Sequence, residues 1–268
     1  MSAYDESKRR AWAGHASTYE RTFALLCAHM GEALLDAAGV GPESSLLDVG
    51  TGTGTVAALG LGRGARVTAI DPDPGMRRIA RRTADRAHVI GGALPHLPFG
   101  DRTFDAVTAN FVLNHVGDPR AAIAELRRVT VPGARVGVTI WPRPLTPLHL
   151  LWEEVLDAAG VDRSAQASVP ASLDFARTPS GLDGLLTCGG LDDVVAQTVT
   201  FTHCVDPEVW WSGPASGIAT IGEIVASQSP ATRADLKEHY DLLSRRYLGT
   251  DGLLHLPTSA VLASGVAT

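Results

Sequence analysis

Three shortages narrow the functions open to this 268-residue chain. It has only three cysteines, which form no CxxC pair and no even-numbered framework, so reduced thiols are expected. Its 23 Lys+Arg are outnumbered by 29 Asp+Glu, which argues against a nucleic-acid binder. No window approaches the ~18 apolar residues of a membrane span, and the N-terminus has no secretory signal. We therefore expect a cytoplasmic protein with neither a nucleic-acid nor a membrane partner.

Metal-site signatures are also missing. The chain contains no HExxH, no Cys/His cluster and no carboxylate pair at metal spacing, so no metal site is expected. Hydrophobic residues, in contrast, make up 45% of the chain, which is enough to bury a substantial core. Disorder is excluded as the global state.

The hydrophobic pattern predicts an α/β fold. Apolar residues recur at three-and-four spacing through residues 19–39, as in amphipathic helices. From residue 45 onward, short apolar runs alternate with segments of helical composition, which is typical of a doubly wound parallel sheet covered on both faces. The predicted strands of this part are 45–50, 65–71, 87–92, 104–110 and 134–141.

After Trp141 the pattern loosens. A proline-rich stretch is followed by a predicted helix over 147–160, and two further strands over 191–205 and 257–267 bring the sheet to seven. A helix over 231–248 is predicted between those two strands. We expect a single domain in four parts: a helical lid (1–40), a cofactor-binding core (41–141), a substrate-capping insertion (142–185) and the rest of the sheet (186–268).

The most informative segment is LLDVGTGTG, residues 46–54, at the end of the first predicted strand. Glycines there allow a tight turn, and the following helix points its amides at a ligand. The third glycine of the dinucleotide pattern G-x-G-x-x-G is replaced by Thr55, and Asp48 would repel a pyrophosphate but receive an amino group. Asp71 closes the second strand and can accept both hydroxyls of a ribose.

With LLDVGTGTG, the motifs AIDPDPGM, LPFGDRTFDAVTANFVLNHVGDP and ELRRVTVPGARVGVTIW resemble, in order and spacing, those of class I S-adenosylmethionine-dependent methyltransferases. The closest likeness is the ubiquinone/menaquinone-biosynthesis-like branch of small-molecule enzymes. The resemblance covers residues 15–141 strongly and the remainder in outline. It implies a Rossmann-like sheet, S-adenosyl-L-methionine as cofactor and S-adenosyl-L-homocysteine as product.

The resemblance also implies cofactor-binding residues. The methionine part would be lined by Asp48, Gly50, Thr51 and Gly52. The ribose and adenine would meet Asp71, Pro72 and Met76, and the methyl end would meet Asn110 and Phe111. Tyr19 resembles the aromatic residue of an N-terminal helix that closes over the site. The chain departs from the family at Ala93, where an acidic residue usually receives the adenine amino group, so backbone atoms of Ala93 and Leu94 would replace it.

Catalytic residues are less clear. His115 and His149 are the candidates, although His115 can equally be satisfied within its turn and His203 is a lone histidine on a late strand. Because the methyl donor is already activated, the protein mainly has to align the reactants and exclude water. A base is needed only if the acceptor must lose a proton.

We expect methyl transfer to a small, largely apolar molecule, with specialised metabolism as the setting. Three alternative functions remain: a cyclase on the same scaffold, a non-enzymatic cofactor-binding protein and a nicotinamide oxidoreductase. The absence of the third glycine of the dinucleotide pattern argues against the oxidoreductase. The sequence allows a homodimer without requiring one.

Overall fold

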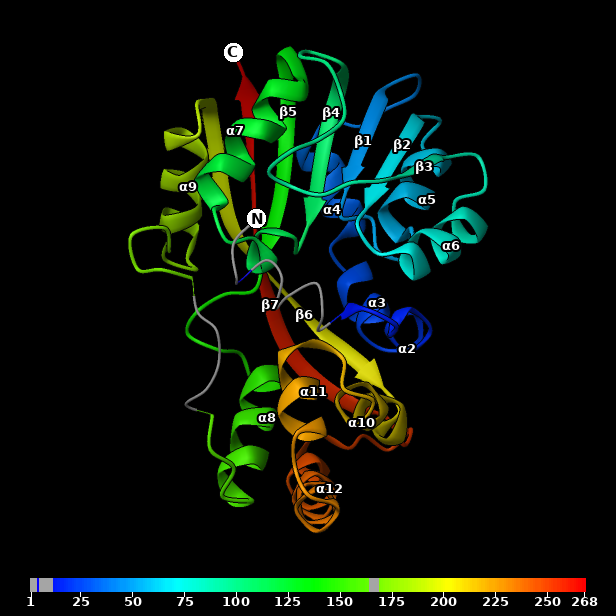
Figure 1. The fold of residues 1–268 in the computed structure, drawn as a ribbon, viewed down its shortest axis with the longest axis vertical. Helices are drawn as coiled ribbons and strands as arrows, with labels where there is room; N and C mark the ends of the chain where they lie inside the picture. Colours follow the sequence, from blue (N-terminus) through cyan, green and yellow to red (C-terminus); the bar gives the residue numbers. More distant parts are fainter. Residues whose placement is uncertain (1–3, 5–11, 164–168) are drawn as a thin grey trace.

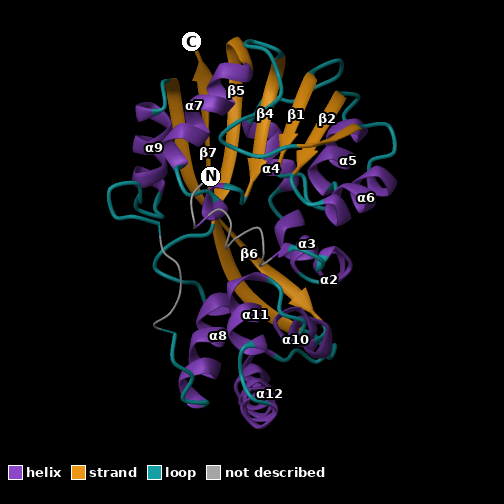
Figure 2. Cartoon of the chain, viewed as in Figure 1, coloured by secondary structure: helices purple, strands orange, loops and turns teal. Residues whose placement is uncertain are grey.

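A seven-stranded sheet forms the upper part of the computed structural model, which describes residues 4, 12–163 and 169–268 (Figures 1 and 2). The strand order is β3-β2-β1-β4-β5-β7-β6. Strands β1 to β5 are parallel, and β7 runs antiparallel to β5 and β6. The strands are β1 Ser45–Val49, β2 Arg66–Asp71, β3 His88–Gly91, β4 Phe104–Asn110, β5 Thr130–Ile140, β6 Leu191–Val205 and β7 Leu254–Ala267. The predicted doubly wound, mostly parallel sheet is confirmed.

Helices cover both faces of the sheet. One face carries α7 (Pro119–Val129) and α9 (Pro179–Cys188), and the other carries α4 (Gly31–Ala37), α5 (Thr55–Gly62) and α6 (Pro74–Thr83). Successive side chains of a strand point to opposite faces, and adjacent Leu46 and Leu47 of β1 are both fully buried, one in each of the two cores. This explains why the strands read as continuous apolar runs rather than alternating ones.

A second group of helices lies beyond the edge of the sheet, where β6 and β7 extend past the other strands (Figure 1). It consists of α8 (Pro147–Ala158), α10 (Pro207–Ala215), α11 (Ala219–Ala226) and α12 (Pro230–Ser244). Trp210 and Tyr240 are fully buried in its core, and Trp152 is 6% exposed. We call these four helices the cap. Its buried tryptophans, Trp152 and Trp210, belong to the cap's own hydrophobic core.

The capping region predicted at 142–185 is divided by the structure. Its first helix, α8, packs against α12, whereas α9 begins at residue 179 and packs against α7, β6 and β7 on the sheet. The physical reason is that β6 is parallel to β5, and a parallel connection requires a crossover that passes over the sheet. The rest of the cap comes from residues 207–244, between β6 and β7, where only the last helix was predicted.

The N-terminal region is helical, as predicted, but broken into short pieces. Helices α2 (Ala16–Arg21) and α3 (Phe23–Ala28) precede α4, with breaks at Thr22 and at His29–Met30. They lie between the sheet and the cap (Figure 2). Residues 1–3 and 5–11 of the predicted lid lie outside the described residues, as do residues 164–168 of the predicted insertion. Among the helices that the structure describes, none is long and apolar enough to cross a membrane.

Candidate cofactor and acceptor site

The glycine loop between β1 and α5 depends on glycine for its conformation. Gly50, Gly52 and Gly54 have φ of +65°, +55° and +87°, a region that other residues rarely adopt. Asp48 lies beneath the loop, 1% exposed, and accepts hydrogen bonds from the hydroxyls of Thr51 at 2.6 Å and Thr108 at 3.1 Å. Asp48 thereby joins the loop to β4, a role that sequence reasoning did not foresee.

Asp71 joins the end of β2 to the same loop. One of its carboxylate oxygens accepts from the backbone N–H of Gly52 at 2.9 Å, and the other from the N–H of Asp73 at 2.9 Å. Burial raises the pKa of both Asp48 and Asp71 from 3.8 to about 6. At neutral pH the loop therefore borders two largely ionised carboxylates with little water around them, an environment that favours a cationic ligand.

Aromatic side chains cover this loop. Tyr19 lies over Gly52, where an added Cβ would come 3.2 Å from the tyrosine ring. Trp12 lies edge-on to Tyr19, with ring centroids 5.5 Å apart, and edge-on to His115 at 5.2 Å. Desolvation raises the pKa of Tyr19 well above 10.0, so the phenol stays neutral. The predicted aromatic cover is thus placed against the predicted loop.

The ends of β4 and β5 form a second polar group beside the loop. Asn110 donates from Nδ2 to the carbonyl of Cys27 at 3.1 Å, and its Oδ1 accepts from the hydroxyl of Thr139 at 2.6 Å. Thr139 also accepts from the N–H of Phe111 at 2.8 Å. Phe111 has φ of +58°, unusual for a non-glycine residue, and stacks on Trp141 at 3.8 Å. Residues this strained are typical of functional sites.

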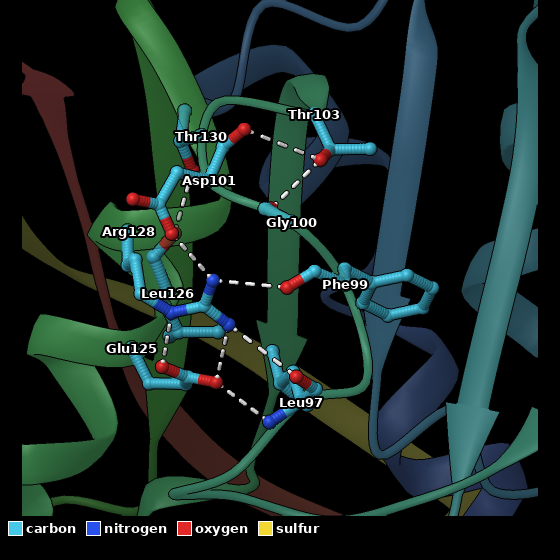
Figure 3. A network of polar contacts seen from close by, with 9 residues as sticks. All are labelled: Leu97, Phe99, Gly100, Asp101, Thr103, Glu125, Leu126, Arg128 and Thr130. Atoms are coloured by element: carbon cyan, nitrogen blue, oxygen red, sulfur yellow. Dashed lines mark hydrogen bonds and ion pairs between the residues drawn. The ribbon is translucent and has the colours of Figure 1, made fainter.

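On the adenine side, Met76 and Leu94 are buried, as their predicted role allows, whereas Pro72 is exposed. The carbonyl of Ala93 already accepts from the N–H of His96 at 3.1 Å. The loop that follows is held by Arg128 (Figure 3). Its guanidinium forms a fork on Glu125 at 2.7 and 2.8 Å and also bonds the carbonyls of residues 97 and 99 and the carboxylate of residue 101.

The two candidate catalytic histidines lie in different surroundings. His115 is in the 3₁₀ turn η1 (Leu113–His115), beside Trp12. His149 lies in the first turn of α8, with Nδ1 2.8 Å from the hydroxyl of Thr146, and this hydroxyl is 2.9 Å from that of Thr258 on β7. The centroid of the His149 ring is 5.0 Å from that of the Trp141 ring. Burial lowers the pKa of His149 to about 4, so this imidazole is neutral at physiological pH.

Sequence reasoning missed Thr108 and Thr139, which hold Asp48 and Asn110. A signal was available, because each is a hydroxyl flanked by apolar residues near the carboxyl end of its strand, and both are fully buried. The backbone role of Cys27 carried no signal. Among the described residues, no group of three His, Cys, Asp or Glu side chains could hold a metal ion.

Comparisons with known proteins agree with this geometry. A family model for a methyltransferase domain matches residues 47–138. The demethylmenaquinone methyltransferase of Renibacterium salmoninarum is 37% identical over 124 residues, which are 46% of this chain and 52% of that protein. The chain thus spans about half of the length of this relative. The demethylmenaquinone methyltransferase of Thermobifida fusca is 33% identical over 197 residues, 68% of this chain and 78% of that protein.

Solved structures share the fold at low identity. The YcgJ protein from Bacillus subtilis is 19% identical with a TM-score of 0.56, over 89% of this chain and 97% of that one. The [4+2]-cyclase SpnF is also 19% identical, with a TM-score of 0.54 over 90% of this chain and 81% of that one. The relatives, the domain match and the site together place this protein: the chain belongs to the class I S-adenosylmethionine-dependent methyltransferases, in the branch that includes the demethylmenaquinone methyltransferases.

Proposed function

We propose that the protein transfers a methyl group from S-adenosylmethionine to a small, largely apolar acceptor with a planar ring. The observation that carries the proposal is the pair of buried carboxylates around the glycine loop, Asp48 and Asp71, because a cationic ligand compensates their burial. A dianionic pyrophosphate would instead raise the electrostatic cost of burying these two carboxylates. When bound, the cofactor supplies a methyl group on a sulfonium, which needs no further activation.

Each part of this chain then has a defined task. Asp71 would accept the ribose hydroxyls, and Gly50, Thr51 and Gly52 would line the methionine part of the ligand. Tyr19 would exclude water from the loop, and Asn110 would face the methyl end from a position set by its bonds to Thr139 and Cys27. The N-terminal helices would cover one side of the bound ligands, and the cap would cover the other.

The acceptor would lie between the ends of β4 and β5 and the cap. Half-buried Trp141, backed by the buried ring of Phe111, offers an apolar, planar wall there, which fits an aromatic or quinone-like ring. The names of the relatives point to a quinone precursor, while a specialised aromatic metabolite presents the same ring. His149, held by Thr146, supplies a neutral imidazole beside Trp141 and would contact the acceptor.

Two measurements test this function. Calorimetric titration should show binding of S-adenosylmethionine and of S-adenosylhomocysteine, and no measurable binding of NAD; tight binding of NAD alone would overturn the proposal. Incubation with hydroxynaphthalenes and other hydroxylated ring compounds should then give products heavier by one methylene. A product of unchanged mass would instead assign the chain to cofactor-bound cyclisation, and binding without any turnover to a sensor.

A further inference from the structure

Two histidines that the proposed function does not use face each other where the N-terminal helices meet β6. His29 follows α3, and its Nε2 is 3.4 Å from Nδ1 of His203. The rings are perpendicular, with centroids 5.5 Å apart. His29 is exposed and stacks on Phe201 at 4.7 Å, whereas His203 is 2% exposed. An accessible imidazole is therefore backed by a buried one.

The pair lies on the same side of the sheet edge as the proposed acceptor wall. Cys27, two residues before His29, accepts the hydrogen bond of Asn110, so the chain leads directly from the methyl end of the site to His29. Phe201 is the cross-strand neighbour of Thr258, which bonds Thr146 at the start of the cap. Both histidines thus belong to the residues that join the sheet edge to the cap.

The contacts that start at Asn110 and pass through His29 to Thr146 return to Asn110 and form a closed ring of contacting residues. From Thr146 they continue to His149, from there to Trp141, and from Trp141 to Phe111, which follows Asn110 in the chain. His29 and His149 therefore stand at separate points of one ring of residues, with the Phe111–Trp141 stack between Asn110 and His149. A planar acceptor against that stack would be bordered by His149, and His29 belongs to the same ring of contacting residues.

The surroundings of His203 select the tautomer of the pair. Its Nε2 is buried and has no hydrogen-bond partner among the described residues, and its ring is inclined to the ring of Trp210, with centroids 5.3 Å apart. An N–H is tolerated beside an aromatic ring, whereas a lone pair is repelled by it. Nε2 of His203 therefore carries the hydrogen, its Nδ1 accepts from Nε2–H of His29, and Nδ1 of His29 keeps a bare lone pair.

We propose that His29 is the proton acceptor for a ring hydroxyl of the methyl acceptor, and that His203 is a positioning residue that holds His29 in the competent tautomer. The inference rests on the proposed function and names its substrate class: phenols and hydroxylated quinone precursors. Desolvation lowers the pKa of both His203 and His29, and the neighbouring His29 lowers the pKa of His203 further.

The step balances without a further reactant. The hydroxyl proton of the acceptor passes to Nδ1 of His29, and the electron pair of the O–H bond stays on oxygen. The oxygen forms a bond to the methyl carbon while the carbon–sulfur bond breaks, and that pair stays on sulfur. His29 leaves the step as an imidazolium stabilised by Nδ1 of His203 and returns the proton to water from its exposed side.

The decisive variant is His203→Phe, tested with 1-naphthol as acceptor. Replacing a buried, half-satisfied imidazole by an apolar ring of similar shape should leave the melting temperature unchanged or raise it. The cofactor Kd should stay unchanged, whereas kcat should fall at least ~10-fold because His29 loses its tautomer. His203→Asn, whose side-chain oxygen can occupy the place of Nδ1, should restore most of kcat.

A second variant, His29→Gln, removes the base itself. It should lower kcat by ~10²-fold. At saturating S-adenosylmethionine, it should also abolish the fall of kcat/KM for the acceptor that the wild type shows at low pH, where His29 becomes protonated. Unchanged kcat in both variants, with an active wild type, would overturn the inference alone. A wild type that binds cofactor but methylates no ring hydroxyl, including 1-naphthol, would overturn the proposed acceptor class and with it the role of His29.

Discussion

The carboxylate of Asp71 accepts a hydrogen bond from the backbone N–H of Gly52 at 2.9 Å and so ties the end of β2 to the glycine loop of β1. A second bond, from the N–H of Asp73, leaves each oxygen with one amide partner and a free lone pair. Asp71 is thus both a structural acceptor and a group that can still receive ligand hydroxyls. Affinity and stability measurements on one variant report on the two roles.

Asp71→Ala should weaken binding of S-adenosylhomocysteine by about 1–3 kcal/mol, because ligand hydroxyls and the amide of Gly52 lose their partner. Titration calorimetry gives the Kd and thermal unfolding gives the stability. Asp118→Ala is the matched control, since Asp118 caps α7 through the N–H of Ala121 and should cost about 1 kcal/mol of stability without changing Kd. An unchanged Kd in folded Asp71→Ala would show that Asp71 only accepts hydrogen bonds from backbone amides and does not contact the ligand.

The raised pKa values of Asp48 and Asp71 predict a pH dependence. Between about pH 4 and 6 the folded chain holds protons on these carboxyls that the unfolded chain has lost, so their contribution to stability falls as pH rises through this window and stays low above it. A cationic ligand reverses this preference by favouring the ionised forms. Affinity for S-adenosylmethionine should therefore rise from pH 5 to 7.

The same linkage gives a direct measurement. Near pH 6, cofactor binding should release protons, which calorimetry in two buffers of different ionisation enthalpy detects. Asp48→Asn should bind more weakly and release fewer protons. Proton uptake by the wild type at this pH would show that the carboxyls are not the groups that meet the cation.

Gly52→Ala tests the contact between the loop and its aromatic cover. Gly52 has φ of +55°, so alanine costs about 1–2 kcal/mol in backbone strain, and its Cβ would also press on Tyr19 at 3.2 Å. Gly39→Ala is matched for backbone strain, at φ of +69°, but meets no atom within 4 Å. Both variants should lose stability by thermal unfolding, and only Gly52→Ala should lose cofactor affinity. Equal affinities would place Tyr19 away from the ligand.

Arg128→Lys tests the clamp on the loop between β3 and β4. Lysine keeps the charge but cannot reproduce the fork on Glu125 together with the bonds to the carbonyls of residues 97 and 99 (Figure 3). We expect a stability loss of about 1–2 kcal/mol and faster amide exchange in residues 96–103. Neighbouring Arg127→Lys, whose guanidinium bonds the carbonyl of Thr268, should leave the exchange of that loop unchanged. Loss of protection in both would indicate general destabilisation.

The sheet and the cofactor loop could be predicted because their signals are local. Buried parallel strands appear as apolar runs, and the turn after β1 requires glycines at fixed positions. The cap could not be predicted in full, because α10 carries internal Gly213 and Pro214 and α11 is a short helix with internal Gly222. The contact of His29 with His203 spans 174 residues, and that of Asn110 with Cys27 spans 83. Local periodicity gives the face of an element and says nothing about such distant partners.

The N-terminal helices and the start of the cap should behave as a lid. Tyr19 covers the glycine loop, with Trp12 beside it, and α2 meets α6 through a small hydrophobic cluster of Ala16, Met76 and Ile79. Segments that open in this way come from the less stable parts of a fold, and both ligands must enter and leave past them. The sequence predicts fast amide exchange around residues 8–20 and 142–185 in the free protein, and among the described residues this expectation applies to 12–20 and to α8. Within the second stretch, α9 should be protected because it packs on β6, β7 and α7 of the main sheet, whereas α8 packs mainly on α12 of the cap. Adding S-adenosylhomocysteine and an acceptor should slow exchange in the first stretch and in α8. Uniform protection of both in the free protein would refute the lid, because a preformed, closed site would then have to admit its ligands by another route.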